Sequence, residues 1–293
     1  MRIFVTGASG WIGSAVVPEL IDAGHQVIGL ARSDASAGAI AATGAEVLRG
    51  DLNDAGSLRA GAAGSDGVIH LAYEHHLGQA GGAKADGEAI ATFTTALAGT
   101  GKPLLITGAT LWTPGRPATE RDELVAQGPI AARVLNLQAA LAATDQDVRV
   151  ALVMIPRSVH GEGDHHGLIP QLVARARQKG ISGYIGDGAS RWPAVHVRDA
   201  ASLYRLAIEK APAGSVLHAV GDEGVAVRDI ARAIGRGLSL PAGSVPAEEF
   251  GMPLAPLLGI DMAASSAITR ELLGWTPTCP GLIADIDDGH YFA

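Results

Sequence analysis

Residues 2–13 read Arg-Ile-Phe-Val-Thr-Gly-Ala-Ser-Gly-Trp-Ile-Gly, a short apolar run followed by three glycines spaced three residues apart. The run from Arg2 to Thr6 is rich in apolar and β-branched residues and predicts a buried strand. Gly7 can form a tight turn, Gly10 can let a pyrophosphate approach the backbone, and Gly13 can let the next helix pack on the strand. That helix would offer free N–H groups and a partial positive charge to a phosphate. The order predicts a dinucleotide-binding site; the alternative is a glycine-rich turn of an ordinary α/β protein.

The composition is typical of a globular α/β protein. Of 293 residues, 47% are hydrophobic and 39 are glycines. The formal net charge of −8 argues against nucleic-acid binding, because phosphate neutralisation needs clustered Lys and Arg. A single cysteine, Cys279, excludes an intrachain disulfide. There is no signal-peptide pattern and no apolar run of membrane-spanning length, so we expect a cytoplasmic protein without nucleic-acid or membrane partners.

Strand and helix patterns alternate through the first half of the chain. Strands are predicted over 2–6, 26–31, 45–48, 67–71, 103–107 and 148–155. Helices are predicted between them, over 11–23, 36–43, 54–63, 83–99 and 129–143. This alternation is typical of a doubly wound parallel sheet with helices on both faces, whose ligands bind beyond the carboxyl ends of the strands.

The pattern loosens after residue 155, and we place a boundary there. Residues 1–155 are predicted to form a dinucleotide-binding Rossmann domain, and residues 156–293 mostly a small, interleaved substrate-binding lobe. A helix is predicted over 168–179 in this lobe. A strand over 192–197 and a helix over 199–210, with Asp199 near its N-cap, are expected to return to the Rossmann domain.

The end of the second strand predicts the type of dinucleotide. An acidic residue at this position would hydrogen-bond the ribose of NAD, but the strand ends at Ala31 and is followed by Arg32 and Ser33. A guanidinium and a hydroxyl suit a phosphate, so we predict NADP(H) over NAD(H); the alternative is that Arg32 is a solvated surface charge. Asp51 and Leu52, after the third strand, are placed to meet the adenine, unless Asp51 caps the next helix.

Further motifs extend this pattern over most of the chain. They are Thr6 to Gly13, Asp51-Leu52, His70-Leu71-Ala72, Pro156-Arg157-Ser158-Val159-His160-Gly161, and Trp192 to Ala201. With these motifs the sequence resembles the short-chain dehydrogenase/reductase superfamily in its extended and atypical branches, the NAD-dependent epimerase/dehydratase-like group. The resemblance implies a Rossmann domain with a small C-terminal substrate lobe, and a homodimer formed through the helices near 83–99 and 129–143.

The resemblance also bears on the dinucleotide site. It implies that Ala72 lines the cofactor through its backbone and that the segment after Ile155 lies beside the nicotinamide. Together with the glycine loop and the other strand ends, it completes the expected set of cofactor-binding residues. These are Thr6, Gly7, Ser9, Gly10, Trp11, Ile12, Gly13, Arg32, Ser33, Asp51, Leu52, Leu71, Ala72, Thr107 and Pro156.

The chain departs from the resemblance at the catalytic pair. The usual acid of the superfamily is a Tyr followed four residues later by a Lys, and no Tyr-x-x-x-Lys occurs in this sequence. The Tyr position falls near Ile130 and the Lys position near Val134. A Ser-rich run after the fifth strand is also replaced, and only Thr107 and Thr110 keep hydroxyls there. Either the proton donor comes from elsewhere, or no proton transfer is catalysed.

Candidate proton donors follow the fourth, fifth and sixth strands. The catalytic candidates are Tyr73, His75, Thr110 and His160, with His76 beside them. The expected substrate pocket contains Trp112, His165, His166 and Trp192, of which the two histidines are also possible donors. The plainer alternatives are that Tyr73 is a packed wall, the histidine pairs are solvated, and the tryptophans are core. No metal site is predicted, because the histidine pairs lack a recognisable ligand spacing.

Three functions remain after this reasoning. The first is an NADP(H)-dependent reductase of a small, largely apolar carbonyl or imine, with a non-standard proton donor. The second is a catalytically silent NADP-binding redox sensor, which the missing Tyr and Lys favour. The third is a sugar-nucleotide epimerase or dehydratase, which the same loss disfavours because that chemistry depends on the Tyr.

Overall fold

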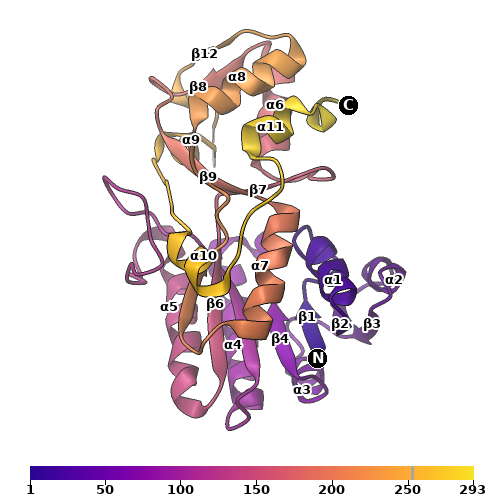
Figure 1. The fold of residues 1–293 in the computed structure, drawn as a ribbon. Coiled ribbons are helices and arrows are strands. Elements are labelled where there is room, and N and C mark those ends of the chain that lie inside the picture. The colour runs from indigo at the N-terminus through magenta and orange to yellow at the C-terminus, as the bar shows by residue number, and fades with distance from the viewer. Residues whose placement is uncertain (252–253) are drawn as a thin grey trace.

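The computed structural model describes residues 1–251 and 254–293 and has a seven-stranded parallel sheet at its centre (Figure 1). The strands are paired in the order β10-β6-β5-β4-β1-β2-β3. The order reverses direction between β1 and β4, which is where the ligand crevice of a doubly wound sheet forms. The strands are β1 (Arg2–Thr6), β2 (Gln26–Ala31), β3 (Glu46–Arg49), β4 (Gly67–His70), β5 (Pro103–Ala109), β6 (Arg149–Ile155) and β10 (Ser215–His218). The predicted fold class is confirmed.

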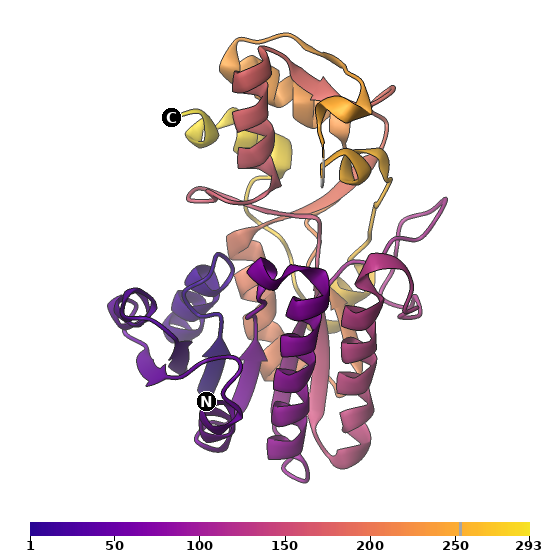
Figure 2. The same cartoon turned by 180° about the vertical axis from the view of Figure 1, so that it is seen from behind.

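Helices cover both faces of this sheet because alternate side chains of each strand are buried on opposite sides. Ile3 and Val5 belong to the core beneath α1 and α7, whereas Phe4 belongs to the core beneath α3, α4 and α5. Figure 2 shows α4 and α5 side by side on their face of the sheet. The helices of this part are α1 (Gly13–Asp22), α2 (Asp34–Ala42), α3 (Ala55–Ala63), α4 (Gly78–Leu97), α5 (Ala131–Ala142) and α7 (Val197–Lys210), with short 3-10 turns η1 (His75–Leu77), η2 (Gly128–Ile130) and η3 (Ala143–Gln146).

Most residues beyond β6 form a lobe over the carboxyl edge of the sheet (Figures 1 and 2). Its core contains Ile169, Trp192, Ile230 and Leu282. Two small sheets, β11-β9-β7 and β12-β8, support this core. The elements are β7 (Ser158–His160), α6 (Leu168–Lys179), β8 (Ser182–Tyr184), β9 (Arg191–His196), β11 (Asp222–Ala226), α8 (Val227–Leu238), β12 (Ala242–Ser244), η4 (Ala247–Glu249), α9 (Leu254–Gly259), α11 (Leu282–Asp287) and η5 (His290–Phe292). The helix α10 (Ala267–Leu273) lies outside the lobe and packs against α7 and β10 at the central sheet (Figure 1). Among the described residues, no helix is both long and apolar enough to cross a membrane.

The strand predicted over 192–197 does not return to the central sheet. It is β9, the middle strand of the small sheet of the lobe, between β11 and β7. The helix that follows it, α7, starts at the next residue and runs along the central sheet to deliver the chain to β10. The seventh strand is therefore Ser215–His218, because a parallel neighbour of β6 must follow the crossover helix rather than precede it.

Asp199 was expected near the N-cap of α7, but the cap is His196, whose Nδ1 accepts from the N–H of Arg198 at 3.2 Å. The carboxylate of Asp199 is buried and accepts instead from the backbone N–H groups of Thr278 and Cys279. Asp199 therefore binds the C-terminal segment to α7.

Candidate functional site

The glycine loop between β1 and α1 is built by close backbone contacts. Gly7 has φ +69°, and a Cβ there would lie 2.8 Å from the backbone N of Ala72. A Cβ on Gly13 would overlap the carbonyl oxygen of Gly7. The N–H of Gly10 donates to the same carbonyl at 2.9 Å, which closes the turn. Larger residues cannot adopt this cradle, and its shape fits a pyrophosphate against the start of α1.

A cavity of about 790 Å³ lies at this loop, between the carboxyl ends of the strands and the lobe. It extends from Arg32 and Asp51, after β2 and β3, past the glycine loop to Pro156, after β6. The lining includes sixteen of the residues singled out from the sequence: Gly7, Ser9, Gly10, Trp11, Ile12, Gly13, Arg32, Asp51, Leu52, Leu71, Ala72, Tyr73, His75, His76, Pro156 and His166. The lining also includes Ile155, Arg157 and Val159, which belong to the segment expected beside the nicotinamide. Residues of the lining that the sequence reasoning did not single out are Leu30, Ser36, Gly50, Glu74, Asp164 and Gly167. The cavity thus joins segments far apart in sequence into one elongated site.

Three predicted cofactor-binding hydroxyls have structural partners instead of facing the cavity. The Oγ1 of Thr6 is 2.7 Å from His70 Nδ1 in the sheet. The Oγ1 of Thr107 is 2.8 Å from the hydroxyl of Tyr204 on α7. The Oγ of Ser33 accepts from the N–H of Ser36 and caps α2. Their polar atoms satisfy local hydrogen bonds, and the three residues are not among those that line the cavity. A role for them in cofactor binding stays a prediction from the sequence.

Two further predicted residues are buried in or below the lobe. His160 is fully buried, and its Nδ1 lies 2.9 Å from Asp285 Oδ2, so it does not face the cavity as a proton donor. Trp192 is also fully buried, and its Nε1 donates to the carbonyl of Leu257 in the core of the lobe. Both residues lie on strands of the small sheet of the lobe, and their side chains are buried in its core. The sequence alone does not distinguish a side chain buried in a core from one that lines a pocket.

The remaining predicted residues lie away from the lining for different reasons. Thr110 is buried where its N–H donates to the carbonyl of Ile155 and joins the ends of β5 and β6. Trp112 is half exposed, and His165 is exposed. Of the predicted proton donors, Tyr73 and His75 are therefore brought to the cavity, and Thr110 and His160 are not.

At the β2 and β3 end of the cavity, a carboxylate lies beside the predicted phosphate-binding cation. Arg32 Nη1 is 3.5 Å from Glu74 Oε1, and Glu74 is 9% exposed whereas Arg32 is 63% exposed. Asn53 Nδ2 donates to the other oxygen of Glu74 at 3.1 Å and to Asp51 Oδ1 at 3.0 Å. This end of the site therefore contains two carboxylates and one exposed guanidinium.

After β4, near the middle of the sheet, Tyr73 packs against a cation that the sequence reasoning overlooked. The Cζ of Arg133, on α5, lies 4.4 Å from the centroid of the Tyr73 ring. Arg133 Nη2 donates to the carbonyl of Thr107 at 3.2 Å. Arg133 directly precedes Val134, where the resemblance places a lysine. Arg133 belongs to no Tyr-x-x-x-Lys spacing, so its place beside Tyr73 follows from the packing of α5 and not from a motif.

The surroundings of Tyr73 keep its proton in place at neutral pH. Burial raises the pKa of Tyr73 above its ordinary value, and the nearby guanidinium of Arg133 partly opposes this rise. The ring of His75 lies 4.8 Å from the Tyr73 ring, centroid to centroid, and is tilted by 58°. Partial burial and Arg133 lower the pKa of His75, so it is neutral at neutral pH. The site thus offers a protonated phenol next to a permanent positive charge.

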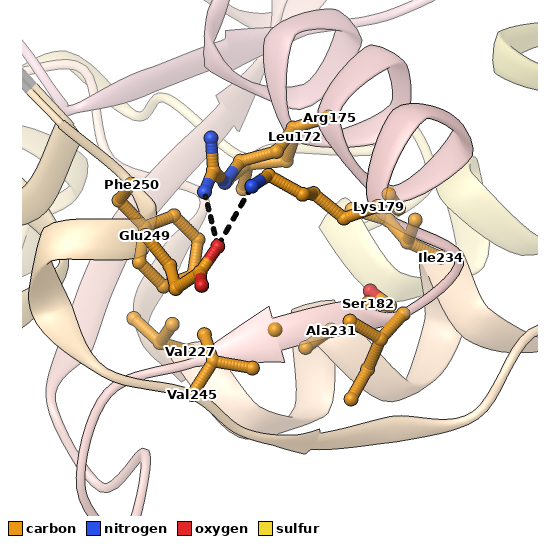
Figure 3. Close-up of a pocket in the computed structure, with 13 residues that line it drawn as sticks. Leu172, Arg175, Lys179, Ser182, Val227, Ala231, Ile234, Val245, Glu249 and Phe250 are labelled. Carbon is orange, nitrogen blue, oxygen red and sulfur yellow. Dashed lines mark ion pairs between the residues drawn. The ribbon is translucent and has the colours of Figure 1, made fainter.

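A second, smaller pocket of about 30 Å³ lies inside the lobe, between α6, β8 and α8 (Figure 3). Its charged groups already have partners: Glu249 is 2.9 Å from Lys179 Nζ and 3.7 Å from Arg175 Nη2. Arg175 also lies over the ring of Phe250, with 4.8 Å from Cζ to the centroid. The pocket has room only for water-sized molecules, and its ion pairs attach residues 249–250 to the lobe.

The chain belongs to the NAD dependent epimerase/dehydratase family, which matches residues 3–219. It is 43% identical over 299 residues to an uncharacterised protein of Schizosaccharomyces pombe, with 100% of both chains covered. It is 30% identical over 229 residues to the 2-alkyl-3-oxoalkanoate reductase of Stenotrophomonas maltophilia, covering 73% of this chain and 67% of the reductase. The crystal structure of a dTDP-glucose 4,6-dehydratase double mutant from Streptomyces venezuelae with NAD bound has a TM-score of 0.80 at 20% identity, covering 99% of this chain and 96% of the dehydratase, and shares the fold. The resemblance found in the sequence is confirmed.

Proposed function

We propose that this protein is an NADP(H)-dependent oxidoreductase that reduces a small carbonyl compound, with Tyr73 as the proton donor. The observation that carries the proposal is the pair formed by Tyr73, at the cavity wall, and Arg133, stacked on its ring. Apolar Leu71, Ala72 and Ile155 line the same end of the cavity and suit a substrate that is largely apolar around its carbonyl. The printed name of one relative, a reductase of 3-oxoalkanoates, supports a ketone as the reducible group.

The chemistry follows from the residues of this chain. The glycine cradle fits the pyrophosphate of the dinucleotide, and bound NADPH would supply a hydride to the carbonyl carbon. As the carbonyl π electrons move to oxygen, Tyr73 donates its phenolic proton to the developing alkoxide. Arg133 stabilises the tyrosinate that remains, since its guanidinium stays charged and lies 4.4 Å from the ring centroid. Water then restores the proton to Tyr73. An imine substrate, already protonated, would depend less on Tyr73.

The preference for NADP(H) rests on Arg32 and is opposed by Glu74. A guanidinium at the wall of the cavity can contact a ribose 2′-phosphate, as in other Rossmann domains. The buried carboxylate of Glu74 attracts Arg32 and repels a phosphate. We propose that Arg32 outweighs Glu74, because Arg32 is exposed, lies 3.5 Å from the carboxylate, and would gain more from a doubly charged phosphate than from the single charge of Glu74. A homodimer and a cytoplasmic location stay predictions from the sequence.

The test is NADPH oxidation with a panel of ketones, aldehydes and imines, using the wild type, Tyr73→Phe and Tyr184→Phe. Tyr73→Phe should lower kcat/KM for ketones by roughly 10²–10³ without changing NADPH affinity, since it removes only the acid. Tyr184→Phe, on β8 and away from the lining, is the matched control and should behave as the wild type.

Two outcomes would replace the proposal by its rivals. NADPH binding without turnover of any panel member would favour the silent redox sensor. Interconversion of a nucleotide sugar without net NADPH consumption would favour the epimerase or dehydratase. Full activity in Tyr73→Phe would instead show that the proton donor is a different group.

A further inference from the structure

The β6 end of the cavity contains a guanidinium without an opposite charge. Arg157 follows β6 and Pro156, lines the cavity, and is largely buried. Its Nη1 donates to the carbonyl of Leu257 at 2.8 Å, and its Nη2 contacts the sulfur of Met262. Its Cζ lies 5.5 Å from the centroid of the Trp192 ring. These contacts hold the guanidinium against the underside of the lobe, at the edge of the cavity that Arg157 lines.

All of these partners are neutral. Among the described residues Arg157 forms no ion pair, although a guanidinium carries five N–H donors. Arg32, Arg175 and Arg191 differ from it, since each faces a carboxylate. Burial lowers the pKa of Arg157 to about 10, which reflects the cost of holding a charge there. A buried charge without a counter-charge is unfavourable unless something supplies one.

The carboxylate of Asp164 does not supply this counter-charge. Asp164 lines the same cavity, but its Oδ1 accepts from the backbone N–H groups of His166 and Gly167 at 3.2 and 2.7 Å. Burial raises the pKa of Asp164, and this carboxylate is not paired with Arg157. The pyrophosphate of a dinucleotide is expected at the glycine loop and the start of α1, whereas Arg157 lies after β6. The counter-charge is therefore to be sought in the second ligand.

We propose that Arg157 binds a carboxylate of the substrate, so that the reducible compound is a small oxo acid rather than a neutral ketone. This rests on the proposed function for the reducible carbonyl, but the binding of the carboxylate does not. A planar carboxylate can accept two parallel N–H bonds from one guanidinium, which gives both affinity and orientation. The apolar lining then contacts the chain of the substrate, and Arg157 fixes the acidic end while the carbonyl faces Tyr73.

The first experiment compares matched acids and esters in the presence of NADPH. The probes are acetoacetate, 2-oxobutanoate and the methyl ester of each. In the wild type, kcat/KM should be at least about tenfold higher for the better acid than for its ester. In Arg157→Gln this acid-to-ester ratio should fall to about one, with unchanged NADPH affinity. Arg157→Lys should keep an intermediate ratio, because lysine retains the positive charge but cannot donate two parallel N–H bonds.

Arg191→Gln is the matched control. Arg191 holds the same segment through Asp261, at 2.7 Å, but is not among the lining residues. It should keep the acid-to-ester ratio of the wild type. Loss of the ratio in Arg191→Gln as well would mean that the segment, not the charge of Arg157, sets the preference, and would overturn the inference.

The second experiment separates this inference from the proposed function. Butanoate, which cannot be reduced, is titrated calorimetrically into the protein–NADPH complex. If the affinity for butanoate is at least about tenfold weaker in Arg157→Gln than in the wild type, the carboxylate site is supported, even if no carbonyl compound is turned over. Equal rates for acids and esters in the wild type, or no butanoate binding, would overturn the site while leaving a reductase intact. Weaker NADPH binding in Arg157→Gln with an unchanged acid-to-ester ratio would assign Arg157 to the cofactor and also overturn it.

Discussion

The two halves of the cavity are specified in different ways. The dinucleotide cradle lies within one stretch, Gly7 to Gly13, and depends on backbone contacts that only glycine permits. The other half is assembled from Tyr73 after β4, Arg133 on α5 and Arg157 after β6, with the lobe above them. The first half is a local steric property of the chain, whereas the second exists only once distant segments have packed together.

Because of this difference, a substitution in the cradle has another consequence than a substitution in the other half of the cavity. A methyl group added to the cradle meets backbone, which cannot move without disturbing β1 and α1. A side chain removed from the other half leaves the sheet intact and changes one charge or one donor. The largest effects are therefore expected in the cradle, and graded effects beyond it.

Gly13→Ala should give the largest loss. The new Cβ would overlap the carbonyl oxygen of Gly7 and crowd Ala8, so the loop must open or α1 must shift. We expect NADPH affinity to fall at least about 100-fold, or about 2.7 kcal/mol. Binding is measured by NADPH fluorescence and folding by thermal unfolding.

The control for this change is Gly38→Ala in the exposed interior of α2, where a Cβ meets no atom within 4 Å. It should leave NADPH binding unchanged and stabilise the protein by roughly 0.5–1 kcal/mol through helix propensity. Normal NADPH binding by Gly13→Ala would show that the cradle is not the binding element.

The same contrast explains what could be predicted from the sequence. The strand over 26–31 and the helix over 168–179 are confirmed to the residue, because hydrophobic periodicity reports which faces are buried. Periodicity does not report the partner, so the strand at 192–197 was assigned to the wrong sheet. The cradle was predictable from its glycines together with their place between a strand and a helix. Arg133 and Glu74 were not, since neither belongs to a spacing motif and each acquires its role from a neighbour in space.

The next largest effect should follow removal of the positive charge beside Tyr73. Arg133→Met should lower kcat/KM for carbonyl reduction by about tenfold to a hundredfold, because nothing then stabilises the tyrosinate. Arg133 lowers the pKa of Tyr73, so its loss should let that pKa rise. Oxidation of the product alcohol needs the ionised phenol and speeds up with pH, so the variant should require a higher pH than the wild type for the same rate. Initial rates of alcohol oxidation with NADP⁺ in alkaline buffers measure this.

Arg133→Lys keeps the charge and should preserve most of the pH dependence, although it loses the planar stacking on the ring. An unchanged pH dependence in Arg133→Met would mean that the guanidinium acts only by packing, through its contacts with the Tyr73 ring and the carbonyl of Thr107.

The smallest effect is expected at the charged pair Arg32–Glu74, at the β2 and β3 end of the cavity. Glu74→Gln keeps the shape and the contact with Asn53 but removes the carboxylate 3.5 Å from Arg32. Since Arg32 is exposed, we expect an NADPH affinity only about threefold to fivefold tighter, with NADH affinity nearly unchanged. Arg32→Ala should have the opposite effect and weaken the affinity for NADPH while leaving the affinity for NADH nearly unchanged. Equal changes in the affinities for NADPH and NADH in Glu74→Gln would mean that Arg32 and Glu74 shape the adenine site and do not contact the 2′-phosphate. Any measured selectivity for NADP(H) would then come from another cation.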